Sequence, residues 1–221
     1  MSVLIYRDTK TVGVCAATLV ASHVLAETKC SIGVDYHETL QPVFESLSEM
    51  TEHGLLAWND AHIFQLFEFL PDDSGQQRIA NLLGKALFAK TDISEHQYTA
   101  PFSSDHSPEE TAALFERKIM EEGGLDVALI AVRNDGALLM NHTAACNPAS
   151  HMEAVDGDWF ITAGLNTLMQ CKHPIVVATG KVSSGAVKAM LKGSLVETPL
   201  AALRLHPGAT FVLDEEAAEL L

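Results

Sequence analysis

Apolar residues fall into two kinds of segment that alternate along the chain. Short apolar, β-branched runs predict strands buried on both faces, whereas apolar residues spaced three and four positions apart predict amphipathic helices. The predicted extended segments are 29–34, 55–58, 63–69, 127–132, 174–179 and 210–213. The predicted helices are 9–27, 39–50, 76–90, 108–122, 162–171, 185–192, 199–205 and 215–221. Strands that alternate with helices indicate an α/β fold of three Rossmann-like layers, a mostly parallel sheet with helices on both faces.

One predicted helix has unusually clear ends. Ser107 supplies an N-cap, Pro108 occupies the first helical position, and Glu110 completes a capping box. The pair Gly123-Gly124 then ends the helix directly before the strand at 127–132. The chain shows no linker, internal repeat or low-complexity segment, so we expect a single domain over residues 1–221.

The stretch 125–143, LDVALIAVRNDGALLMNHT, is where we expect a functional site. Its buried strand breaks abruptly into the turn-forming residues 133–136, RNDG. A second apolar run follows and ends at Asn141 and His142. Open α/β sheets bind their ligands beyond the carboxyl ends of their strands, so this polar turn is the predicted ligand site.

Composition narrows the range of partners. The 221 residues include 14 Lys+Arg and 29 Asp+Glu, a formal net charge of −15, which argues against nucleic acid and anionic membranes. An anionic ligand would therefore depend on a locally positive pocket. No membrane-spanning run or signal peptide is expected, and the four cysteines lack a C-x-x-C pair, which favours reduced thiols in the cytoplasm.

Five stretches, in this order, resemble one enzyme family. They are 32–47 (IGVDYHETLQPVFESL), 64–73 (FQLFEFLPDD), 123–142 (GGLDVALIAVRNDGALLMNH), 161–191 (ITAGLNTLMQCKHPIVVATGKVSSGAVKAML) and 203–221 (LRLHPGATFVLDEEAAELL). Together they resemble the glucosamine-6-phosphate deaminase/isomerase and 6-phosphogluconolactonase superfamily over nearly the whole chain. The resemblance implies a glucosamine-6-phosphate isomerase-like fold and a role in carbohydrate metabolism.

The early motifs depart from the family pattern. The family's glycine-rich phosphate-binding turn corresponds to residues 35–39, which contain no glycine and add two carboxylates that repel phosphate. Thr39 remains as a hydrogen-bond donor. The base that opens and enolises the sugar falls at Phe67, which cannot accept a proton, while Glu68 keeps the neighbouring acid.

The central and late motifs are altered as well. Asp135 and Gly136 are retained, but the family's catalytic histidine falls at Ala137 and the acid that follows it falls at His142. The lysine that binds phosphate falls at Ser183, and Lys181 lies two residues earlier. A base, an acid and a phosphate anchor are all needed for aldose–ketose isomerisation. We therefore expect the family's standard activity to be absent.

These correspondences define the candidate residues. The catalytic candidates are Asp135, His142 and Glu68, and the substrate-binding candidates are Thr39, Gly136, Asn141 and Lys181. Each has a plainer interpretation: Asp135 as a turn-capping aspartate, His142 as a loop histidine, Glu68 as a structurally paired acid and Lys181 as a solvated lysine. His206, in the LHPG segment, is favoured as a structural residue.

A metal and a cofactor are not expected. His142, Cys146 and His151 have the spacing H-x3-C-x4-H, but no fourth ligand or familiar zinc pattern accompanies them. Two functions stay open. One is an enzyme that acts on a sugar or sugar phosphate with Asp135 and either His142 or Glu68 as a rearranged acid–base pair. The other is a non-catalytic protein that binds a sugar or regulates a partner. A homo-oligomer is compatible with both.

Overall fold

The computed structural model of the protein describes residues 1–27, 29–70, 78–142, 149–195 and 198–221. Its centre is a seven-stranded sheet in which every neighbouring pair is parallel, in the order β1-β10-β9-β6-β2-β3-β5. The strands are β1 (Ser2–Tyr6), β2 (Cys30–Val34), β3 (Ala61–Gln65), β5 (Tyr98–Thr99), β6 (Val127–Ala131), β9 (His173–Ala178) and β10 (Thr210–Asp214). This parallel sheet confirms the predicted α/β class.

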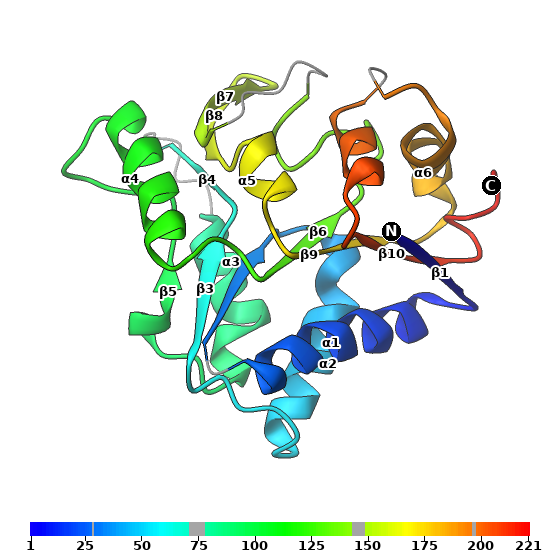
Figure 1. The fold of residues 1–221 in the computed structure, drawn as a ribbon, viewed down its shortest axis with the longest axis horizontal. Helices are drawn as coiled ribbons and strands as arrows, with labels where there is room; N and C mark the ends of the chain where they lie inside the picture. Colours follow the sequence, from blue (N-terminus) through cyan, green and yellow to red (C-terminus); the bar gives the residue numbers. More distant parts are fainter. Residues whose placement is uncertain (28, 71–77, 143–148, 196–197) are drawn as a thin grey trace.

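Helices cover both faces of the sheet, as Figure 1 shows for α1 and α2 on one side and α5 and α6 on the other. The first group is α1 (Thr9–Ala26), α2 (Gln41–Glu52) and α3 (Ile79–Ala86), and the second is α4 (Pro108–Glu121), α5 (Leu165–Met169) and α6 (Ser184–Lys192). Short 3₁₀ segments are η1 (Glu38–Leu40), η2 (Phe88–Lys90), η3 (Glu95–Gln97), η4 (Lys181–Ser183) and η5 (Pro199–Leu205). Helix α4 begins with the predicted capping box of Ser107 and Glu110.

Two hydrophobic cores flank the sheet, and strand β6 contributes to both. Val127, Leu129 and Ala131 face the core beneath α1 and α2, whereas Ala128 and Ile130 face the core beneath α4 and α6. Alternate residues of a strand point to opposite faces, so a strand covered on both sides must be apolar throughout. This is why the central run lacks the alternating polar residues of a half-exposed strand.

A small antiparallel sheet was not predicted. It consists of β4 (Phe67–Phe69), β8 (Asp158–Thr162) and β7 (His151–Val155), in that order. The prediction of a loop from 141 to 158 is therefore wrong for residues 151–155 and for Asp158. Asp156 and Gly157 form a two-residue hairpin turn with φ of 53° and 96°, the left-handed geometry for which Asp-Gly is a strong signal. Strand β7 is only partly buried, and its apolar pattern is too weak to be recognised.

Three other local predictions differ from the structure. Strand β1 was not predicted, because an edge strand that buries few side chains has no clear apolar pattern. Residues 215–221 form turns and not a helix, and residues 55–58 form no strand. A helix of only seven residues would gain few internal hydrogen bonds, so local periodicity alone does not stabilise one at 215–221.

Helix α1 meets the length and composition of a membrane span, with 18 residues and a hydropathy of 1.3. Its Val12, Ala16 and Val20 are nevertheless fully buried against the rest of the fold. A Cβ on Gly13 would lie 2.7 Å from Pro42, so α1 and α2 approach each other very closely there. Such packing is typical of a helix in the core of a globular protein.

The stacked histidines at the amino-end edge of the sheet predict pH-dependent stability. The rings of His23 and His173 have centroids 4.1 Å apart. Burial, and then the His173 ring, lower the pKa of His23, while Asp126 and Glu27 partly oppose the shift. The unfolded chain therefore binds the proton at higher pH than the folded one. The stabilising contribution is complete above the ordinary value of 6.5 and is lost as the pH falls below it.

Urea unfolding between about pH 7.5 and pH 5 measures this contribution. His23→Phe keeps an aromatic ring without a proton to gain, so its unfolding free energy should fall less steeply with decreasing pH than that of the wild type. A residual slope is expected, because burial also lowers the pKa values of His37 and His62. Identical slopes for the two proteins would contradict the prediction.

Candidate functional site

The carboxyl ends of β2 and β6 lie side by side and carry a buried ion pair. Arg133 donates from its two terminal nitrogens to the two carboxylate oxygens of Asp35, at 2.9 and 2.8 Å. The backbone N–H of Ala131 also donates to Asp35, at 2.9 Å. Asp35 has no exposed surface and Arg133 is 8% exposed. The guanidinium lies 5.4 Å from the ring centroid of Phe67. The first residue of the predicted ligand-binding turn is thus part of a buried ion pair.

His37 lies beside this pair. Its Nδ1 accepts the backbone N–H of Thr39 at 3.2 Å and contacts the Thr39 hydroxyl at 2.9 Å. Burial, and then the positive charge of Arg133, lower the pKa of His37. The ring is therefore neutral near pH 7, with its proton on Nε2. Thr39, a predicted substrate-binding residue, is 8% exposed and uses both its amide and its hydroxyl to orient His37.

Asp135 and His142 come together as a pair. His142 Nδ1 lies 3.2 Å from Asp135 Oδ2, and the other carboxylate oxygen accepts the N–H of Ala137 at 2.9 Å. The His142 side chain is 34% exposed and the Asp135 side chain is 52% exposed. The two groups form an ion pair when the ring is protonated. The geometry thus offers an accessible imidazole beside an acid.

The turn between them is held in an unusual backbone conformation. Gly136 has φ of 76°, and a Cβ there would lie 2.7 Å from Thr198 Cγ2. Leu139 has φ of 55°, which is rare for a residue with a side chain. Asn141 secures the turn, because its amide donates to the carbonyls of Leu138 and Ala163 at 2.8 and 3.1 Å. The predicted binding roles of Gly136 and Asn141 thus coincide with positions that shape the turn.

Glu68 is held in a different arrangement. Its carboxylate accepts the backbone N–H groups of Ile79 and Ala80, the first residues of α3, at 3.0 Å each. It also accepts from Gln65 at 3.0 Å, and the Tyr98 hydroxyl donates to the Gln65 carbonyl oxygen. Glu68 is 1% exposed. Among the described contacts it acts as a remote cap for α3, which favours the structural interpretation.

We expect Glu68→Ala to lower the free energy of unfolding by about 2–3 kcal/mol. The substitution leaves the N–H groups of Ile79 and Ala80 without the acceptor that they now share. Urea unfolding followed by circular dichroism measures the loss. Glu68→Gln keeps one carbonyl acceptor and should lose less. Wild-type stability in the alanine variant would contradict the capping role.

None of the described contacts of Lys181 involves Asp135 or His142. Its ammonium pairs with Glu219 at 3.0 Å, and its side chain is 73% exposed. Ser183, at the family's lysine position, is buried and donates to the Thr179 carbonyl at 3.0 Å. His206 is 6% exposed and accepts the N–H of Gly208 at 3.1 Å, as a structural residue would.

The described residues contain no group of three or more metal-binding side chains. Of the proposed metal set, Cys146 lies outside the residues that the structure describes. His142 is paired with Asp135, and His151 contacts Glu153 at 3.2 Å and the Ala149 carbonyl at 2.9 Å.

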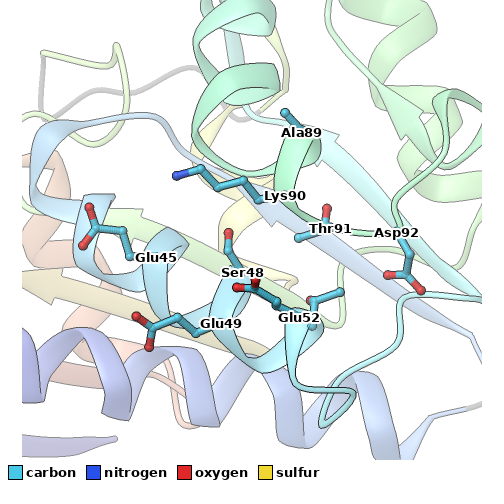
Figure 2. Close-up of a pocket in the computed structure, with 9 residues that line it drawn as sticks. Glu45, Ser48, Glu49, Glu52, Ala89, Lys90, Thr91 and Asp92 are labelled. Carbon is cyan, nitrogen blue, oxygen red and sulfur yellow. The ribbon is translucent and has the colours of Figure 1, made fainter.

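A cavity of about 660 Å³ lies elsewhere, between α2 and residues 89–92, as Figure 2 shows. Its acidic lining residues are Glu45, Glu49, Glu52 and Asp92, and Lys90 adds one positive charge. None of the predicted site residues lines it. Its excess of carboxylates is unfavourable for an anionic ligand.

The sequence did not predict the buried ion pair of Arg133 and Asp35 or the neighbouring His37. Asp35 directly follows the buried strand β2, and Arg133 lies two residues after the buried strand β6. These positions are the one signal that could have singled them out. Their pairing depends on β2 and β6 being neighbours, although they are separated in the chain by two other strands of the same sheet. The order of strands was not predictable from the pattern of apolar residues.

Comparison with known proteins identifies the family of this chain. The family model of glucosamine-6-phosphate isomerases/6-phosphogluconolactonase matches residues 14–212. Glucosamine-6-phosphate deaminases of Pseudoalteromonas translucida (strain TAC 125) and Corynebacterium aurimucosum are 26% and 28% identical, covering all of this chain and 90% and 94% of theirs.

Solved structures agree in fold. A monomeric glucosamine-6-phosphate deaminase superposes with a TM-score of 0.92 at 18% identity, covering all of both chains. The 6-phosphogluconolactonase from Trypanosoma brucei gives a TM-score of 0.80 at 18% identity, covering 100% of this chain and 98% of its own. The predicted resemblance is confirmed: the chain belongs to the family of glucosamine-6-phosphate isomerases and 6-phosphogluconolactonases.

Proposed function

We propose that this protein performs acid–base chemistry on a sugar or sugar derivative, with His142 as the proton-transferring group and Asp135 as the residue that orients it. The contact of 3.2 Å between His142 Nδ1 and Asp135 Oδ2, beyond the carboxyl end of β6, is the observation that carries the proposal. The family's members act on substrates of this class, and ligands of open α/β sheets bind at this edge.

The chemistry suits this geometry. An imidazole beside a carboxylate can take a proton from a water or hydroxyl group and return it to a leaving group or ring oxygen. The same motion of a proton serves hydrolysis of a lactone and ring opening of a sugar. Asp135 stabilises the charged imidazolium that forms in between.

The family's standard reactions are proposed to be absent. Phe67 stands where the resemblance places the enolising base, and Phe67 is buried and cannot accept a proton. Glu68 beside it is engaged at the start of α3. These two features also support the alternative, a non-catalytic sugar-binding protein in which Asp135 and His142 hold a ligand without transforming it.

Turnover of glucosamine 6-phosphate, 6-phosphogluconolactone and their unphosphorylated counterparts tests the proposal, with thermal unfolding in the same ligands as a measure of binding. We expect at least one unphosphorylated ligand to be turned over by the wild type and not by Asp135→Ala. Turnover of glucosamine 6-phosphate or 6-phosphogluconolactone would overturn the proposed absence of the standard reactions. Binding without turnover would support the non-catalytic alternative. A panel that neither raises the melting temperature nor reacts would overturn both.

A further inference from the structure

Arg133, the first residue of the predicted ligand-binding turn, already has an anion bound to it. A guanidinium presents parallel N–H groups that bind one carboxylate or phosphate in a forked manner. In Arg133 that fork is filled by Asp35, at 2.8 and 2.9 Å, and the third donor to Asp35 is the Ala131 amide. Asp35 is completely buried. The carboxylate therefore belongs to the interior of the fold.

The charges around His37 show the balance at this edge of the sheet. The charged groups that act on the His37 ring are Arg133, Asp35, Glu38 and Asp135. One cation is thus set against three carboxylates, and among the described contacts Asp35 is the carboxylate that pairs with the cation. Lys181, the other cation considered for the site, is paired with Glu219. Because Asp135, the partner of His142, is one of the three carboxylates, an anion near this pair would meet more carboxylates than cations among these groups.

We propose that Asp35 acts as a built-in counter-ion to Arg133, so that the site takes a sugar ligand that carries no phosphate or carboxylate. This inference rests on the proposed function, because it names the ligand class of the same site. A phosphate ester would have to displace Asp35 from the guanidinium or lie beside unpaired carboxylates, and both are unfavourable. A neutral sugar, or one that bears an ammonium group, meets neither obstacle.

The first experiment compares matched ligands on the wild-type protein. Glucosamine and glucosamine 6-phosphate differ only in the phosphate, and isothermal titration calorimetry measures the dissociation constant of each. We expect glucosamine to bind at least about tenfold more tightly than its phosphate, a difference that calorimetry resolves readily. Equal or tighter binding of glucosamine 6-phosphate would overturn the inference and leave the acid–base proposal standing.

The second experiment frees the guanidinium. In Asp35→Ala the Arg133 fork is empty, so inorganic phosphate should bind there and raise the melting temperature relative to chloride of equal ionic strength. The wild type should show no such rise. Asp35→Asn, which keeps the side-chain shape, serves if the alanine variant does not fold.

The matched control is Glu122→Ala. It changes the net charge by the same amount and frees Lys118, which pairs with Glu122 at 3.3 Å on the surface of α4. Phosphate should not raise its melting temperature more than that of the wild type. If freeing Arg133 gives no response to phosphate beyond this control, the guanidinium is not a group from which Asp35 excludes phosphate, and the inference about the ligand class is wrong. If phosphate acts on the Asp35 variants but no sugar binds the wild type, the counter-ion is supported and the proposed function fails.

Discussion

Arg133→Met should lower the free energy of unfolding by about 3–5 kcal/mol. The substitution keeps an apolar stem of similar length but leaves the Asp35 carboxylate buried, with the Ala131 N–H as its one remaining donor among the described contacts. Removing one partner of a buried ion pair leaves an uncompensated charge in a medium that solvates it poorly. Urea unfolding followed by circular dichroism measures the loss.

Two variants show whether burial is the cause. In Asp35→Leu/Arg133→Met no charge remains, and stability should return to within about 1–2 kcal/mol of the wild type. Lys118→Met breaks a pair whose side chains are 43% and 30% exposed, and should cost less than about 1 kcal/mol. A loss below about 1 kcal/mol in Arg133→Met would show that the pair is not isolated from solvent.

His142→Ala should reduce turnover of the ligand identified in the substrate panel by about 10²- to 10⁴-fold. In the proposed mechanism the imidazole takes and returns the proton, whereas Asp135, 3.2 Å away, stabilises the charged ring. Asp135→Asn should therefore retain more activity than His142→Ala, because the ring remains in place. Steady-state kinetics on each variant, with folding verified by circular dichroism, measures both effects.

His142→Ala and Asp135→Asn should change the free energy of unfolding only slightly, since both side chains of this pair are at least one-third exposed. An exposed ion pair adds little to the free energy of unfolding. His151→Ala is the control, because His151 contacts Glu153 and the Ala149 carbonyl and has no described contact with Asp135. Wild-type turnover by His142→Ala would show that the proton is transferred by another group.

Most of the sheet could be predicted from local patterns. Strand β6 is apolar at every position because both of its faces are covered, and α4 begins and ends where its capping box and glycine pair require. The edge strands β1 and β5, the hairpin of β7 and β8, and the terminal turns at 215–221 were not predicted. A local pattern is strongest where both faces of an element lie against a core.

The candidate site divides in the same way. Asp135 and His142 are seven residues apart on one turn, so their proximity follows from local chain geometry, and the sequence alone made them candidates together. Glu68 was also a candidate from its position in the chain. Its contacts with the first turn of α3 depend on how β4 packs against that helix, which no local pattern reports.

The sequence by itself thus determined the parallel α/β fold, the family, and the turn at which a ligand is expected. Apolar periodicity, turn residues and collinear motifs are properties of neighbouring positions, and they carry this information directly. Only the tertiary structure showed which charges pair beside the candidate turn. Asp35 and Arg133 are 98 residues apart, and each is a polar residue after a strand until β2 and β6 pair. The sequence pattern suggests two exposed charged residues, whereas in the fold they form one buried ion pair.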